Sequence, residues 1–158
     1  MSRLNATKAE IDEYLRLLDA TPRRIGACTE EASEAQLAQS PDRQGWSAAQ
    51  VLGHLRACAE LWSFSIYAML AQGNPTLMLA DERKWAKTRG FDRFGFRKSF
   101  LAFALGREEL MGVLRELPLE AWERTAVIEN RSHSVFSQVR RMALHEAEHC
   151  DQIELLLV

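Results

Sequence analysis

The sequence has few of the residues that cross-link a chain or direct it out of the cell. Only three cysteines occur among 158 residues, and this odd number lacks the spacing of a disulfide framework. The opening stretch, MSRLNATKAEIDEYL, contains no apolar run after its first basic residue, so we expect no secretory signal. Disulfides belong to oxidising compartments, and the sequence therefore predicts reduced thiols and a cytoplasmic location.

Long apolar runs and an excess of basic charge are missing as well. No stretch approaches the roughly 20 consecutive apolar residues of a membrane-spanning helix, so no membrane partner is expected. The 20 Lys and Arg residues are outnumbered by 22 Asp and Glu residues, which gives a formal net charge of -2. Nucleic-acid-binding domains usually carry a basic face, and the composition therefore predicts no nucleic-acid partner.

Helical periodicity dominates what is present, and the length of 158 residues predicts a single domain over residues 1–158. Helices are expected at about 7–19 with a continuation to about 31, at about 47–72, at about 96–117, and from 132 or 134 to about 157. Proline disfavours helix at the residue before it, so Thr21 and Pro22 are expected to interrupt the first helix. The run Ala-Val-Ile at 126–128 is the one strand candidate, and it is too short to build a sheet. Four long helices with apolar stripes predict an all-α four-helix bundle.

Three of the four histidines fall on inward-facing seams of these helices. The last helix has a seam with alternating spacings of three and four, formed by Val135, Gln138, Met142, His145, His149, Gln152 and Leu156. Residues that recur in this way lie on one face of a helix, where a bundle normally places Leu or Ile. The same spacing puts His54 on the inward seam of the second helix, beside Val51 and Cys58. His133, at the start of the last helix, is expected to be exposed.

A divalent metal is one explanation for three inward histidines. Burying a polar group without a partner costs on the order of 2 kcal/mol or more. Imidazole is a good ligand for zinc, nickel and iron, and the i,i+4 spacing of His145 and His149 puts two ring nitrogens on one face. Together with His54 they would hold one metal and leave coordination positions open to water or substrate. The alternative is that all three are polar core residues with other partners.

The same stretch also fits a metalloprotease pattern. His145-Glu146-Ala147-Glu148-His149 matches H-E-x-x-H, in which the glutamate is the base, and equally matches the inverted form H-x-x-E-H. A third ligand usually lies well downstream, but only nine residues follow His149, and no strand is expected to align a peptide. Glu146 lies about 100° around the helix from His145. We therefore do not favour a protease.

Two short motifs at opposite ends of the chain resemble those of the DinB-like superfamily, also called DinB/YfiT-like metalloenzymes. The residues that carry the resemblance are Trp46, Ser47 and His54 within GWSAAQVLGHL, and His145, His149 and Gln152 within ALHEAEHCDQIELL. Their order and spacing are similar to the family over nearly the whole chain. The resemblance implies an up-down-down-up bundle, often a homodimer, with a three-histidine metal site. It also implies a relation to thiol-dependent transferases and isomerases.

One position departs from the family pattern. Relatives often have a His-His-Arg-Gly-Gln-like run around the last ligand, where this chain has Glu148-His149-Cys150-Asp151-Gln152. All three ligands are kept, but the local charge changes from basic to acidic. If the basic residue helps relatives to hold an acidic thiol cofactor, that role is not expected of this segment.

These observations predict a divalent-metal-dependent enzyme with a small-molecule substrate. It would be either a thiol-dependent transferase, using a low-molecular-weight thiol as second cofactor, or a small-molecule hydrolase. The alternative is a non-catalytic module that binds metal or dimerises. Gln152, one turn beyond His149, is a candidate for contacting a metal-bound species, and Glu148 is a candidate base. Each has an alternative role, Gln152 as a polar seam residue and Glu148 as a solvated side chain. Cys58 is expected to be a buried, inert thiol.

Overall fold

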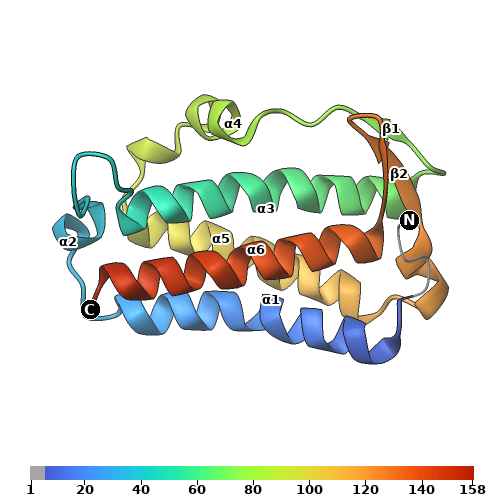
Figure 1. The fold of residues 1–158 in the computed structure, drawn as a ribbon, viewed down its shortest axis with the longest axis horizontal. Coiled ribbons are helices and arrows are strands. Elements are labelled where there is room, and N and C mark those ends of the chain that lie inside the picture. The colour runs from blue at the N-terminus through green and yellow to red at the C-terminus, as the bar shows by residue number, and fades with distance from the viewer. Residues whose placement is uncertain (1–5) are drawn as a thin grey trace.

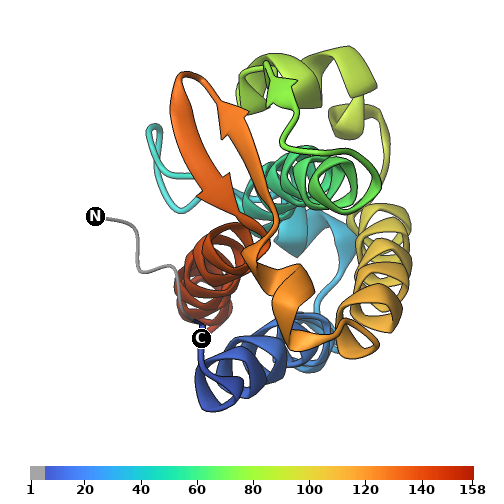
Figure 2. The same ribbon diagram turned by 90° about the vertical axis from the view of Figure 1, so that its right-hand side faces the viewer.

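Four long helices run side by side in the computed structural model, which describes residues 6–158 (Figure 1). They are α1 (Lys8–Thr29), α3 (Ala48–Ala71), α5 (Phe96–Arg115) and α6 (Val135–Leu156). Helices α1 and α6 run in one direction, and α3 and α5 run in the other (Figure 1). Seen along the bundle, α1 and α3 lie diagonally opposite each other, and each packs against both α5 and α6 (Figure 2). The predicted all-α bundle with up-down-down-up topology is confirmed.

The connections follow from these helix directions. Because α3 and α5 run the same way, the chain between them must return along the length of the bundle. This return contains β1 (Thr76–Leu77), α4 (Glu82–Arg89) and the short 3-10 helix η1 (Phe91–Arg93), and α4 packs on the outside of α3. The other connections contain α2 (Glu34–Ala38) at one end, and η2 (Leu119–Glu123), β2 (Thr125–Ile128) and β3 (Arg131–Ser134) at the other. Among the helices of residues 6–158, none combines the length and apolar character needed to cross a membrane.

Hydrogen bonds from side chains define where the helices begin. Capping boxes start α1, α2, α3 and α6, with Thr7, Ser33, Ser47 and Ser134 as the N-cap residues. The predicted start of α3 at Ser47 is among them, since Ser47 Oγ accepts from the backbone N–H of Gln50 at 3.1 Å. Helix α5 has no such residue of its own. Instead the Glu34 carboxylate in α2 accepts hydrogen bonds from the backbone N–H groups of Phe96 and Arg97, at 2.8 and 3.1 Å.

The expected interruption of the first helix at Pro22 is wrong, because α1 continues through it. Proline has no N–H, so the carbonyl oxygen of Leu18, four residues earlier, lacks its helical partner. Arg107 of α5 supplies one, with its Nη1 donating to the Leu18 carbonyl at 3.1 Å. The same guanidinium forms a two-pronged ion pair with Glu146 of α6, at 2.6 and 2.5 Å. A neighbouring side chain therefore replaces the hydrogen bond that proline removes.

The expectation that 126–128 builds no sheet is also wrong. These residues lie in β2, which pairs antiparallel with β3 and parallel with β1. The sequences of β1 and β3 contain few of the β-branched and aromatic residues that favour strands. These segments therefore pair with β2 because the packing of the helices places them beside it. The hairpin turn places Glu129 and Asn130 at φ angles of 51° and 65°, as a two-residue turn with right-handed strand twist requires. His133 lies opposite Ala126 in β3 and is half-buried, not exposed at the start of a helix.

A polar layer crosses the bundle between two clusters of apolar core residues. One cluster contains Leu110 and Met142, and the other contains Phe103 and Ile153. Arg107 therefore lies between the clusters on α5, as do the histidines and Glu146 on α6. The side chains of Arg107 and Glu146 are only 4% and 2% exposed, so this pair depends on its own internal hydrogen bonds.

Arg107→Met is predicted to destabilise the protein by about 3–5 kcal/mol, because it leaves the buried Glu146 charge without its partner. The measurement is urea unfolding followed by circular dichroism. The double variant Arg107→Met/Glu146→Leu should recover most of that loss. Arg115→Met, which removes an exposed ion pair with Asp19, is the matched control and should cost about 0–1 kcal/mol. If Arg107→Met lowers the free energy of unfolding no more than Arg115→Met does, the buried ion pair does not have the stabilising role proposed for it.

Candidate metal centre

The three histidines predicted as metal ligands come together between α3 and α6. His54 Nε2 lies 3.0 Å from His145 Nε2, and His149 Nε2 lies 3.1 Å from the same atom. His145 and His149 are one turn apart on α6, and α3 packs against α6 in the opposite direction, so His54 faces both. All three rings are half-buried. Three Nε2 atoms therefore converge on one point of the polar layer.

Gln152 fixes the proton position of one of these rings. Its Oε1 lies 2.7 Å from His149 Nδ1, and an amide oxygen can only accept, so Nδ1 carries the proton. In this tautomer Nε2 can offer its lone pair to a metal, and it is directed toward the other histidines. An oriented imidazole of this kind is the usual arrangement of a metal-binding histidine.

Burial keeps His54 and His145 uncharged. Burial, together with the neighbouring His149 and His54, lowers the pKa of His145 to about 3. Burial and His149 also lower the pKa of His54. A neutral His145 Nε2 can form only one linear hydrogen bond, yet two ring nitrogens lie within 3.1 Å of it. Its buried Nδ1 has no partner within the described chain. The ring cluster therefore leaves at least one close nitrogen pair without a proton between them.

A divalent metal fits this donor set. Metal–nitrogen bonds of about 2.0–2.1 Å, with angles between octahedral and tetrahedral, separate two ligand nitrogens by roughly 2.9–3.4 Å. The observed separations of 3.0 and 3.1 Å fall in this range. A cation would also satisfy all three lone pairs at once, which hydrogen bonds among neutral rings cannot do.

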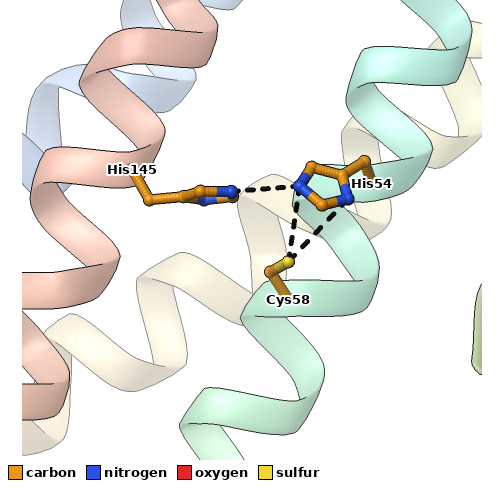
Figure 3. A group of neighbouring side chains, drawn as sticks. All are labelled: His54, Cys58 and His145. Atoms are coloured by element: carbon orange, nitrogen blue, oxygen red, sulfur yellow. Dashed lines mark hydrogen bonds between the residues drawn. The ribbon is translucent and has the colours of Figure 1, made fainter. Parts of the chain in front are cut away.

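Cys58 is a further donor beside the histidines. Its Sγ lies 3.7 Å from His54 Nε2 and 4.0 Å from Nδ1, one helical turn along α3 (Figure 3). The ligand atoms of His54, Cys58 and His145 all lie within 4.8 Å of one another. The thiol is buried as expected, and burial raises the pKa of Cys58 to about 12. It is therefore a protonated thiol at neutral pH. Its Sγ nevertheless lies close enough to the histidines to be a further ligand for a bound cation.

Neither glutamate of the protease-like pattern faces this cluster as a base. Glu146 points into the bundle and is held by Arg107. Glu148 is exposed, and no described side chain forms a hydrogen bond or ion pair with it. The H-E-x-x-H interpretation has no available base here, because its glutamate is part of a structural ion pair.

Two tryptophans hold the histidine rings in place. Trp46 packs on His54 with ring centroids 5.3 Å apart, and Trp62 packs edge-on against His145 at 4.9 Å. The guanidinium of Arg141 lies over Trp62, 4.4 Å from its centroid. Both tryptophans therefore pack against the candidate ligands themselves.

A cavity of about 560 Å³ lies beside His54, between α3, α4 and the start of α5. Its walls include Trp46, Gly53, Glu82 and Arg83. Sequence reasoning missed the last two, since they lie in the irregular segment between the second and third long helices. Hydrophobic periodicity shows where a helix lies in the sequence. It does not show which long helix the connection between α3 and α5 packs against. No signal in the sequence alone would have placed α4 against His54.

The fold and the cluster together define a helical-bundle protein with a histidine–cysteine–histidine group suited to a divalent metal. Residues 17–153 match the sequence profile of the DinB superfamily, and the chain belongs to that family. Among solved structures it is similar to "YfiT from Bacillus subtilis is a probable metal-dependent hydrolase with an unusual four-helix bundle topology". The TM-score is 0.86 and the identity 18%, over 99% of this chain and 90% of that one. At this identity the likeness establishes the fold. No curated protein shows significant sequence similarity.

Gln152→Leu is predicted to weaken metal affinity about 10–100-fold, because His149 loses the acceptor that orients its ring. Affinity for zinc can be measured by competition with a chromophoric chelator. Gln36→Leu, at the start of α2 and outside the histidine cluster, is the control and should leave the affinity unchanged. Equal affinities for wild type and Gln152→Leu would show that Gln152 is only a polar residue of the helix seam.

Proposed function

We propose that this protein is a divalent-metal-dependent enzyme that acts on a small molecule, with His54, His145 and His149 as the metal ligands. The observation that carries the proposal is the convergence of three Nε2 atoms, with separations of 3.0 and 3.1 Å. Burial lowers the pKa of two of these rings, His54 and His145, and so keeps them neutral. Zinc, nickel and iron all suit imidazole ligands. The description of YfiT as a probable metal-dependent hydrolase supports the same class of function.

The metal would supply a nucleophile by activating a bound water or thiol. A divalent ion held by three neutral imidazoles lowers the pKa of a water or thiol and so supplies a nucleophile near neutral pH. The chain's own residues do the remaining work. Gln152 holds His149 in the tautomer that presents Nε2, and Trp46 and Trp62 restrict the rings of His54 and His145. The cavity beside His54 has the volume of a small-molecule site.

Proton transfer is better assigned to Glu82 than to Glu148. Glu148 is exposed and does not line the cavity, whereas Glu82 is half-buried and lines it together with His54. A general acid or base must come within hydrogen-bond reach of the reacting group. Gln152 keeps a supporting role through His149 and is not assigned to contact substrate.

Hydrolysis is the first candidate reaction, and thiol-dependent transfer is the second. Thiol-dependent transfer remains a candidate because the cavity of about 560 Å³ has room for a low-molecular-weight thiol beside an electrophile. The homodimer implied by the family resemblance is part of the proposal. A non-catalytic metal-binding or dimerising module is the alternative that the experiments below separate from an enzyme.

Protein purified without a histidine tag is predicted to contain about one divalent metal per chain, measured by inductively coupled plasma mass spectrometry. His149→Ala should lose the metal, because two ring nitrogens cannot replace three. His133→Ala, which alters the one histidine outside the cluster, should keep it. Absence of metal from the wild type after reconstitution with zinc, nickel and iron would rule out the metalloenzyme.

Metal-loaded protein is predicted to turn over activated small-molecule esters or to join a thiol to an electrophile. Suitable probes are p-nitrophenyl acetate, and cysteine with 1-chloro-2,4-dinitrobenzene. Glu82→Gln should lower the rate about 10²–10⁴-fold with metal content unchanged, while Glu148→Gln should have little effect. If metal binds tightly but no probe shows metal-dependent turnover, the non-catalytic module is favoured.

A further inference from the structure

Gly53 occupies an unexpected position for a glycine. It lies inside α3, one residue before His54, where glycine weakens a helix relative to alanine. Close packing does not require it, because apart from its chain neighbours and the backbone of its own helix no atom lies within 4 Å of the place where a Cβ would be. The open space at this point is the cavity beside His54, which Gly53 lines. The missing side chain therefore keeps the approach to His54 free.

The walls of this cavity differ in character. Aromatic rings line one part, contributed by Trp46, Phe91, Phe94 and Phe96. Helix α4 lines another with Glu82, Arg83 and Lys87. A cavity with a large apolar surface and a few charged groups suits a small organic molecule with an apolar body and a charged end. Planar rings in the wall favour a planar, aromatic body.

The charges in the wall favour an anionic end once a metal is present. Glu34 is already used, since its carboxylate accepts from the backbone at the start of α5. Arg83 and Lys87 form no ion pair with any residue of the described chain, and Glu82 and Asp92 oppose them in the same wall. Glu34 keeps its charge while it accepts from the backbone, so the five charged residues of the wall sum to -1. They offset only part of the charge of a divalent ion held by neutral imidazoles, and the remaining positive charge lies at the His54 end.

We propose that this cavity is the binding site for an amphipathic organic anion, with its aromatic body against the Trp46 and Phe96 side and its anionic group toward His54. The preference for an anion rests on the proposed metal site, whereas the location of the aromatic body rests on the cavity and on Gly53. An amphipathic organic anion is thus the substrate class of the proposed enzyme.

The location is tested with two fluorescent probes of similar shape, the anion 1-anilinonaphthalene-8-sulfonate and the neutral N-phenyl-1-naphthylamine. Gly53→Phe fills the cavity and should lower the affinity for both probes about tenfold or more. Gly106→Phe is the matched control, since Gly106 is also a helical glycine with open space around its Cβ position, in a separate groove between α3 and α5. It should leave both affinities within about twofold of the wild type.

Folding is checked with the milder variant. Gly53→Ala should raise the melting temperature by about 2–4 °C, because it removes a helix-interior glycine without a clash, and it should leave probe binding nearly unchanged. Metal content should stay the same in all three variants. Probe affinity in Gly53→Phe that equals the wild type, in a folded protein, would overturn the location of the site.

The charge preference is tested by loading zinc. Zinc should tighten binding of the sulfonate probe about threefold or more and leave the neutral probe unchanged. Equal responses of the two probes would overturn the preference for an anion. A protein that binds none of zinc, nickel and iron would refute the proposed function and the anion preference with it. The comparison of Gly53→Phe with Gly106→Phe would still decide whether this cavity is the site.

Discussion

The buried ion pair between Arg107 and Glu146 sets the geometry on which the rest of the structure depends. Glu146 must face Arg107, because a carboxylate that is 2% exposed needs a charged partner. This requirement fixes the rotation of α6 about its own axis. His145 is one residue earlier, about 100° around the helix, and so faces α3, where His54 lies. The same guanidinium bonds the free carbonyl at Leu18. One side chain thus ties together α1, α5 and α6.

The direction of the helices explains the cavity beside the histidines. Two neighbouring helices that run the same way need a connection as long as the bundle, and that connection must lie on the outside. Here it is fastened to α3 through Glu60, which accepts from Trp85 Nε1 at 2.7 Å and from Arg89 Nε at 3.1 Å. The space left between α4 and α3 is the cavity. The topology that distinguishes this bundle from a simple up-and-down one therefore also provides room for a ligand.

The sequence predicted the features that depend on local pattern. The four long helices, the start of α3 near Ser47 and the inward direction of the three histidines follow from local spacing alone. It failed where distant residues decide the outcome. Pro22 stays helical because of Arg107, and the run at 126–128 becomes a strand because β1 and β3 reach it. Glu82 was missed for the same reason, since only the packing of α4 on α3 brings it to the cavity wall with His54.

The separation of the ligands along the chain has a consequence for how the site is assembled. His54 and His145 are 91 residues apart, and closing a loop of that length before the helices dock is entropically unfavourable. In small zinc domains the ion and the fold form together, whereas here the donor atoms lie on two separate helices, α3 and α6, and meet only where these helices pack. A metal at the proposed site would therefore be selected by a gap that the packed helices already form.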